Sequence, residues 1–233
     1  MYKKVLLKLS GEALAAPDFP FSVDILEDVA LQVKEIREMG VDVGIVIGGG
    51  NICRGRIFEE LGFDRVDSDY AGMLATVINA IMFAAMLNKV GVKAKALSSV
   101  DAQNVERFDA DKANEYIKDG YVLVFGGGAG LPYHSTDTGA ALRAHDIGAE
   151  VILMAKSGVD GVYSKDPGKN PDATRFDELS FNDILNLGLK VIDEQAAALC
   201  SEYKIEGFVF SMSEEHNIVK AVKNEAVGTR ITF

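Results

Sequence analysis

The chain contains 233 residues, of which 48% are apolar and 25% are charged, and its formal net charge is −11. A chain of this size buries enough surface to fold without disulfides or a structural metal, and its composition excludes the disordered, collagenous and disulfide-rich classes. The acidic balance argues against nucleic-acid binding, which needs a cationic footprint. It does not argue against phosphate-bearing small molecules, because a site can be locally positive inside an acidic protein.

Cysteine usage and hydropathy both favour a soluble protein of the cytoplasm. Cys53 and Cys200 are too few for a disulfide framework and fit a reducing compartment as free thiols. The N-terminus has only short apolar runs, unlike a signal peptide. The longest continuous apolar stretch, Ala80–Leu87, is far shorter than the ~20 residues that a membrane span requires. We therefore expect neither a membrane nor a nucleic acid among the partners.

Short apolar runs alternate with segments of helical periodicity along the chain. The first predicted strand, Val5–Leu9, stops at Ser10-Gly11, and the first predicted helix, Asp24–Met39, has Ser22 as its cap and Gly40 at its end. In chain order there follow a strand at Val41–Ile47, a helix at Asp69–Val90, strands at Lys93–Leu97 and Tyr121–Phe125, a helix at Thr136–Ile147, a strand at Val151–Met154, an irregular stretch at Tyr163–Asp177, helices at Phe181–Leu187 and Asp193–Tyr203, a strand at Phe208–Phe210, a helix at Asn217–Asn224 and a strand at Thr229–Phe233. This alternation predicts a three-layer α/β/α sandwich around a mostly parallel sheet, formed by residues 1–233 as one domain.

The predicted helix Asp69–Val90 is apolar on nearly every side. Five large apolar residues distributed around its circumference are Met73, Val77, Ile81, Met82 and Met86. Such a helix lies either in the centre of the core or in a subunit interface, and both interpretations stay open at this point.

Three glycine-rich turns directly follow predicted strands, at residues 8–11 (KLSG), 48–51 (GGGN) and 126–130 (GGGAG). Ligands of open α/β sheets bind at the carboxyl ends of the strands, and glycine lets backbone N–H groups approach an anion closely. Three such turns together favour a polyphosphate site. The Walker motif is missing, and Cys53 and Leu131 stand where a dinucleotide-binding G-x-G-x-x-G would need its third glycine.

Several charged residues accompany these turns. Lys8 ends an apolar strand, where an ammonium is costly unless it reaches a polar site. Arg54 and Arg56 follow the triple glycine, and a guanidinium can clamp phosphate oxygens. Asp137 near the start of a predicted helix is either a helix cap or, at a phosphate cleft, a carboxylate that orients Lys8 or a hydrated Mg²⁺. This collection is typical of phosphoryl transfer, which depends on positioning and charge neutralisation.

No protein-held metal is expected from the histidines and cysteines. His134, His145 and His216 lack metal-ligand spacing, and neither cysteine belongs to a CxxC pair.

Five segments together resemble the bacterial UMP kinases of the amino-acid kinase superfamily. These segments are KLSGE at 8–12, IGGGN at 47–51 with Arg54-Gly55, Asp69 with GMLAT at 72–76, STD at 135–137, and VDGVY at 159–163 with Asp166-Pro167. The similarity runs from Tyr2 to Thr232. The first two segments are shared across the superfamily, whereas Asp69 with its helix and the STD segment narrow the resemblance to UMP kinases.

The resemblance implies the amino-acid kinase fold, with the UMP side mainly in the N-terminal part and the ATP side mainly in the C-terminal part. It implies transfer of the γ-phosphoryl group of ATP to UMP in pyrimidine nucleotide biosynthesis, with Mg²⁺ held mainly by the nucleotide phosphates. It also implies an allosteric homohexamer built as a trimer of dimers.

The resemblance also assigns roles to individual residues. The catalytic residues would be Lys8, Arg54 and Asp137. The ATP-binding residues would be Lys8, Leu9, Ser10, Gly11, Gly50, Arg54, Ser157, Tyr163 and Asp166. The UMP-binding residues would be Gly49, Asp69, Ala129, Gly130, Leu131, Pro132, Tyr133, His134, Ser135 and Thr136, with Asp69 on the ribose hydroxyls.

The chain departs from the family pattern in places. Residues Ala15–Pro20 stand where a glycine-rich turn is usual, and the loop between Arg54 and Asp69 can differ. The family's better-known GTP site uses basic residues on the central helix, where this chain offers Ala84 and Asn88; the response to effectors is therefore open. Two other functions also stay open: a superfamily kinase with another acceptor, and a nucleotide-binding sensor or storage subunit.

Overall fold

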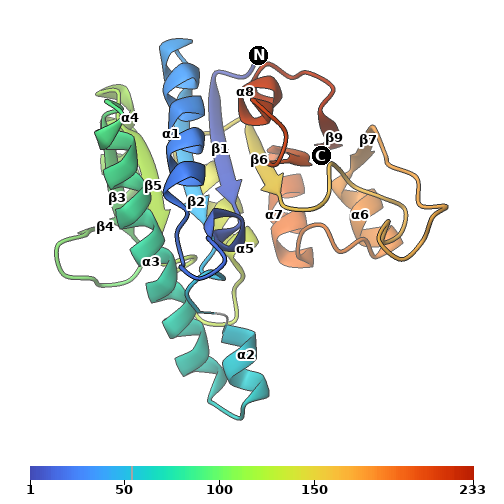
Figure 1. Ribbon diagram of the computed structural model, residues 1–233, viewed down its shortest axis with the longest axis horizontal. Coiled ribbons are helices and arrows are strands. Elements are labelled where there is room, and N and C mark those ends of the chain that lie inside the picture. The colour runs from blue at the N-terminus through green and yellow to red at the C-terminus, as the bar shows by residue number, and fades with distance from the viewer. Residues whose placement is uncertain (54) are drawn as a thin grey trace.

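The computed structural model describes residues 1–53 and 55–233 and places one nine-stranded sheet between two layers of helices (Figure 1). The strands are β1 (Lys4–Leu9), β2 (Asp42–Ile47), β3 (Ala94–Ser98), β4 (Glu106–Arg107), β5 (Val122–Gly126), β6 (Val151–Lys156), β7 (Glu178–Ser180), β8 (Glu206–Ser211) and β9 (Gly228–Thr232). The helices are a 3-10 turn η1 (Gly11–Leu14), α1 (Val23–Glu38), α2 (Gly55–Glu60), α3 (Arg65–Lys89), α4 (Ala110–Lys118), α5 (Thr136–Ile147), α6 (Phe181–Leu187), α7 (Glu194–Tyr203) and α8 (Asn217–Val222).

The sheet has the strand order β4-β3-β5-β2-β1-β6-β8-β9-β7. All neighbouring strands run parallel except β8 and β9, which are antiparallel. The prediction of a mostly parallel sheet is confirmed. Because β5, β2, β1 and β6 are consecutive and parallel, their carboxyl ends lie at one edge of the sheet, and this edge collects the three glycine-rich turns.

Two hydrophobic cores cover the two faces of the sheet. On one face α1, α3 and α8 pack against side chains such as Leu7 and Leu9 of β1. On the other face α4, α5, α6 and α7 pack against the alternate side chains, such as Leu6. Successive residues of a strand point to opposite faces, so a buried central strand needs apolar residues at nearly every position. The three-layer sandwich predicted from the sequence is confirmed.

Capping residues set the ends of several helices. The Ser22 hydroxyl accepts a hydrogen bond from the Ile25 N–H and begins α1, as predicted. The helix α3 begins at Arg65 rather than at the predicted Asp69, because the Asp64 carboxylate accepts hydrogen bonds from the N–H groups of Val66 and Asp67. The sequence analysis did not predict α2, α4 or the short strands β4 and β7. In α4 only Ala113 and Ile117 are buried, so its apolar spacing spans a single turn.

The long helix α3 has one buried side and one exposed side. By length and composition alone it could cross a membrane, with a mean hydropathy of 1.8 over its most apolar window, but half of that window is buried in the fold. Met73, Val77 and Met86 are buried within the chain itself, whereas Ile81 and Met82 are exposed. The expected interface residues therefore divide between the chain's own core and its surface.

Candidate active site

An ion pair joins the end of β1 to the first turn of α5. The Lys8 Nζ lies 2.6 Å from the Asp137 Oδ1, and the two side chains are only 13% and 18% exposed. Burial acts to raise the pKa of Asp137, but the positive charges of Lys8 and Lys156 and the hydrogen bond from Lys8 outweigh burial and lower this pKa. Asp137 is therefore ionised at neutral pH and holds the Lys8 ammonium in place.

Asp137 does not cap its helix, because Ser135 does. The Ser135 hydroxyl accepts hydrogen bonds from the N–H groups of Asp137 and Thr138 at 2.9 and 3.1 Å. The same hydroxyl donates to the carboxylate of Asp193, which in turn caps α7 through the Ala196 N–H. The backbone N–H of Asp193 also bonds to Asp137. These bonds fix the N-termini of α5 and α7 together and leave the Asp137 carboxylate directed at Lys8.

The glycine-rich turns pack closely against each other and against α3. The side chains of Asn51 and Asn79 exchange hydrogen bonds of 3.0 and 2.8 Å, and Asn79 also donates to the Gly48 carbonyl. The Thr76 hydroxyl accepts a bond of 2.7 Å from the Gly127 N–H. A Cβ on Gly11 would lie 2.2 Å from the Gly48 carbonyl oxygen, so only glycine fits there.

A cavity of about 210 Å³, here called the acceptor cavity, opens between the second turn, α3 and the segment before α5. The residues that line it are Gly49, Gly50, Cys53, Ser68, Asp69, Gly72, Met73, Thr76, Gly128, Leu131, His134, Ser135 and Thr136. Most of the polar atoms that these residues present come from hydroxyls, backbone groups and one carboxylate. Such a lining suits a polar ligand that carries hydroxyl groups.

Asp69 is the carboxylate in the acceptor cavity. Its oxygens accept bonds of 3.0 and 2.9 Å from Arg65 Nε and of 2.7 Å from the Tyr133 N–H. A carboxylate offers about four lone-pair sites, so capacity for ligand hydroxyls remains. Its side chain is 16% exposed, which means that it is oriented by the protein but reachable from the cavity.

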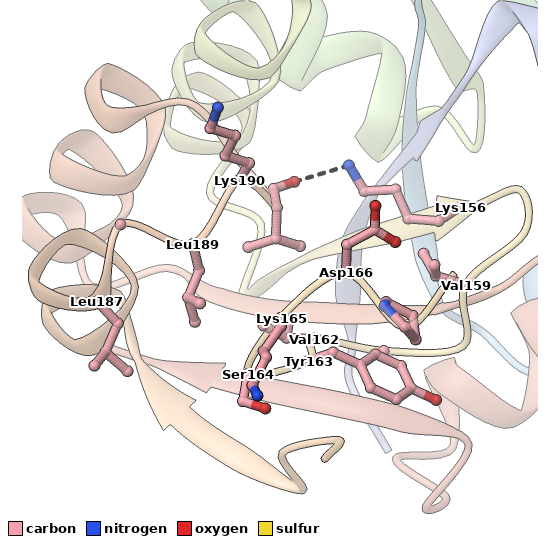
Figure 2. Close-up of a pocket in the computed structure, with 14 residues that line it drawn as sticks. Lys156, Val159, Val162, Tyr163, Ser164, Lys165, Asp166, Leu187, Leu189 and Lys190 are labelled. Carbon is pink, nitrogen blue, oxygen red and sulfur yellow. Dashed lines mark hydrogen bonds between the residues drawn. The ribbon is translucent and has the colours of Figure 1, made fainter. Parts of the chain in front are cut away.

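A larger cavity of about 520 Å³, here called the donor cavity, lies beyond the end of β6 (Figure 2). The residues that line it are Lys156, Val159, Gly161, Val162, Tyr163, Ser164, Lys165, Asp166, Pro167, Leu187, Gly188, Leu189, Lys190 and Val191. Tyr163 donates a bond of 2.7 Å to Asp160, whose other oxygen accepts from Arg175. An aromatic ring, aliphatic side chains and a carboxylate together suit a nucleoside.

A third cavity of about 460 Å³, here called the central cavity, joins the donor cavity to the ion pair. It is lined by Asp137, Lys156 and residues of α6 and of the loop before α7. Lys156 therefore lines both cavities, and its Nζ donates a bond of 2.8 Å to the Val191 carbonyl. The sequence analysis did not single out Lys156, although it is the last residue of the buried strand β6 and Lys8 is the last but one of β1.

The expected site residues take up the following places. Six of the ten expected UMP-binding residues line the acceptor cavity, the exceptions being Ala129, Gly130, Pro132 and Tyr133. Tyr163 and Asp166 line the donor cavity, whereas the exposed Ser157 is not among its lining residues. Gly50, expected at ATP, lines the acceptor cavity instead.

Three other residues expected at the ATP phosphates, Leu9, Ser10 and Gly11, lie at the end of β1 and the start of η1. Leu9 is fully buried, so only its backbone can reach a ligand, and Ser10 and Gly11 continue the chain from it into η1. Arg54 lies outside the described residues. Cys53, Ser68, Gly72, Met73 and Thr76 were not expected in the site, and Gly128 was expected only as part of the third glycine-rich turn. Ser68, Gly72, Met73 and Thr76 lie on α3. The last three belong to the GMLAT segment, and their helical spacing from Asp69 could have indicated them.

Within residues 1–53 and 55–233, no three His, Cys, Asp or Glu side chains are grouped closely enough to hold a metal ion. Ala84 is buried, and the Asn88 side chain bonds to the backbone of Ala84 and Ala94. These two positions on α3 therefore offer no positive charge to an anionic effector.

Comparison with known proteins places this geometry in a family. The chain is 45% identical to a uridylate kinase of Limosilactobacillus reuteri over 99% of this chain and 97% of that protein. The crystal structure of a UMP kinase from Bacillus anthracis superposes with a TM-score of 0.94 at 37% identity, covering 99% of this chain and 96% of that one. A UMP kinase from Ureaplasma parvum gives a TM-score of 0.95 at 36% identity over the full length of both chains. The amino acid kinase family model matches residues 3–211, and the chain belongs to this family.

Proposed function

We propose that this chain transfers the γ-phosphoryl group of ATP to UMP and releases ADP and UDP. The observation that carries this function is the Lys8–Asp137 ion pair, which stands between a nucleoside-sized donor cavity and a smaller acceptor cavity at one edge of the sheet. The full-length similarity to uridylate kinases supports UMP as the acceptor.

Phosphoryl transfer in such a site needs no covalent intermediate with the protein. A phosphate oxygen of UMP forms a bond to the γ-phosphorus while the bond from that phosphorus to the bridging oxygen of ADP breaks. Catalysis then rests on alignment and on stabilisation of the charge that develops on the transferred group. Lys8 supplies a positive charge there, and Asp137 keeps it in position. Arg54 is proposed to lie between the two nucleotides' phosphates.

Binding roles follow the two cavities. Tyr163 and Asp166, with Ser157 nearby, hold the adenosine of ATP, and the turn from Lys8 to Gly11 together with Gly50 holds its phosphates. For UMP, Asp69 accepts hydrogen bonds from the ribose hydroxyls, while Gly49 and the segment 129–136 hold the base and the phosphate. The proposed UMP-binding residues present mostly backbone groups and hydroxyls, which can recognise a flat, polar base by hydrogen bonding.

Mg²⁺ is proposed to enter with ATP rather than to occupy a site of its own. Mg²⁺ normally keeps several waters and binds through substrate phosphates, whose charge it helps to neutralise. The partly buried carboxylate of Asp137 lies beside the proposed phosphate path, and the described residues include no group of three His, Cys, Asp or Glu side chains that could hold a metal ion. We predict that the protein without nucleotide binds Mg²⁺ only weakly and that ATP increases the uptake. Calorimetric titration with and without ATP measures this, and tight stoichiometric binding to the nucleotide-free protein would contradict it.

The proposal extends to the whole protein. We propose that residues 1–233 form one domain whose N-terminal part holds mainly UMP and whose C-terminal part holds mainly ATP. The protein would serve pyrimidine nucleotide biosynthesis in the cytoplasm and assemble as a homohexamer. We propose that anionic effectors bind at residues other than Ala84 and Asn88, which carry no positive charge.

A coupled assay tests the function directly. ADP release is followed with UMP, CMP, dUMP and, for the alternative kinases of the superfamily, carboxylate, carbamate and isoprenoid phosphate acceptors. Turnover with UMP well above turnover with the other acceptor classes is expected. ATP-dependent turnover that is faster with a non-nucleotide acceptor would contradict the assignment. ATP and UMP binding without any turnover would indicate the sensor or storage subunit.

A further inference from the structure

A second lysine stands at the phosphoryl-transfer edge of the sheet. Lys156 is the last residue of β6, which pairs with β1 so that Ala155 is opposite Leu9. Lys156 therefore lies next to the turn that follows Lys8. Figure 2 shows its side chain extending from the strand end across the donor cavity, and the same side chain lines the central cavity beside Asp137.

Lys156 is a partly buried lysine close to a second positive charge, that of Lys8. Burial lowers the pKa of Lys156, the charge of Lys8 lowers it further, and Asp137 raises it. Two ammonium groups thus share the field of a single carboxylate. A partly buried cation without full compensation is costly for the fold, and an anionic ligand offsets this cost when it binds.

The ammonium of Lys156 has hydrogen-bonding capacity for such a ligand. It carries three donors, and the carbonyl of Val191 accepts from it at 2.8 Å. Lys190 lines the same two cavities, but it is exposed and points away from Lys156 in Figure 2. Water screens an exposed charge, so Lys156 is the better preorganised of the two cations.

We propose that Lys156 binds the β- and γ-phosphates of the donor nucleotide and, together with Lys8, neutralises the triphosphate next to Asp137. This inference rests on the proposed function, because it takes the donor cavity as the site of ATP. It adds a binding residue on β6 that connects the nucleoside part of the donor cavity with the ion pair in the central cavity.

A purely structural role makes different predictions. The hydrogen bond to the Val191 carbonyl also connects β6 to the loop before α7, and this structural contact alone could explain why a lysine stands at this position. Lys156→Gln retains a donor for the Val191 carbonyl but removes the charge, whereas Lys156→Met removes both. Lys156→Arg restores the charge. Lys4→Met is a matched control, because Lys4 is a partly buried strand lysine that donates to a backbone carbonyl, that of Ile147, at 2.9 Å.

The experiment measures ATP and adenosine binding to these variants by calorimetry in the absence of UMP. Loss of a charge-assisted hydrogen bond is expected to weaken ATP binding about 10- to 100-fold in both Lys156→Met and Lys156→Gln. Adenosine binding should remain within a factor of about two to three of the wild type, Lys156→Arg should recover most of the ATP affinity, and Lys4→Met should change neither ligand.

Two results would overturn the inference. One is an ATP affinity of Lys156→Gln equal to that of the wild type, which would mean that Lys156 only connects β6 to the loop before α7. The other is an equal loss of ATP and adenosine affinity, which indicates a deformed cavity. If Lys156→Met does not fold, the comparison of Lys156→Gln with Lys156→Arg decides. Because UMP is absent, a wild type that binds ATP through Lys156 but does not phosphorylate UMP would refute the proposed acceptor and leave this inference intact.

Discussion

At the scale of single residues, the Lys8–Asp137 pair is where the proposed chemistry is concentrated. Lys8→Ala removes a preorganised charge aimed at the transferred phosphoryl group, which typically lowers kcat about 10²–10³-fold. The KM for UMP should change little, because Lys8 contacts Asp137 and is not among the residues that line the acceptor cavity. Steady-state kinetics measures both. Lys4→Ala, a substitution at the opposite end of β1, serves as the control, and near-wild-type turnover in a folded Lys8→Ala protein would falsify the role.

Substitution of a second residue, Asp69, tests how the proposed acceptor UMP is recognised. If its carboxylate accepts from the ribose hydroxyls, Asp69→Asn should weaken UMP and CMP binding roughly tenfold and dUMP binding less, since dUMP lacks one hydroxyl. The bonds from Arg65 and the Tyr133 N–H orient this carboxylate in advance. Asp67→Asn, an exposed change on the same helix turn, should leave all three affinities unchanged. An equal loss of affinity for dUMP and UMP would contradict the proposed contact between Asp69 and the ribose hydroxyls.

Single residues also show how far the sequence alone predicts the site. Lys8 could be predicted because a lysine at the end of an apolar run needs a polar destination, and the structure supplies Asp137. Asp193 could not, because its bonds to Ser135 and Asp137 join helices more than fifty residues apart in the chain. The same strand-end argument that selected Lys8 applies to Lys156. Lys156 was not recognised from the sequence because the predicted strand ended two residues before it.

At the scale of elements, the turns after β1 and β2 behave as one unit. The Cβ of Gly11→Ala would lie 2.2 Å from the Gly48 carbonyl oxygen, so the two turns would have to separate. Overpacking of this kind typically costs about 1–3 kcal/mol. We expect a lower Tm and a lower kcat, since Lys8 precedes this turn. Gly48→Ala, whose Cβ would meet no atom closer than 3.7 Å, should keep its Tm. Thermal unfolding of the two variants makes the comparison, and equal Tm values would contradict the steric argument.

The elements differ in how well local signals define them. The bounds of α5 and α6 were predicted correctly because serine caps begin these helices and glycines in the left-handed region end them. The start of α3 was misplaced, since Asp64 lies in a loop without an apolar pattern. The short strands β4 and β7 depend on pairing with distant strands, which no local signal reveals. The site lies at the ends of the long, well-predicted strands, so its glycine-rich turns and the residues Lys8 and Asp137 could be anticipated. Most of the residues that line the donor and central cavities belong to loops and short helices without such a signal and could not be anticipated.

At the scale of the whole molecule, α3 carries a stripe of exposed apolar side chains. Its members Tyr70, Leu74, Ile78, Ile81 and Met82 are each between 42% and 49% exposed. They recur at intervals of three, four or one residues and so share one side of the helix. A contiguous apolar stripe of this length is unusual on the surface of a monomer. A second copy of α3 would cover it across a two-fold axis, where the same patch meets itself.

We predict that this contact forms the dimers of a homohexamer, so light scattering should give about six times the chain mass of 25.1 kDa. Ile78→Glu would bury two carboxylates against each other at the axis, because each copy contributes one, and should split the particle or prevent soluble expression. Leu31→Glu is the matched control, since Leu31 is equally large and 50% exposed but lies on α1 rather than on α3. It should leave the mass unchanged. A dimer that Ile78→Glu dissociates would keep the α3 contact and refute the hexamer, whereas a concentration-independent wild-type monomer would refute both and leave the stripe facing water.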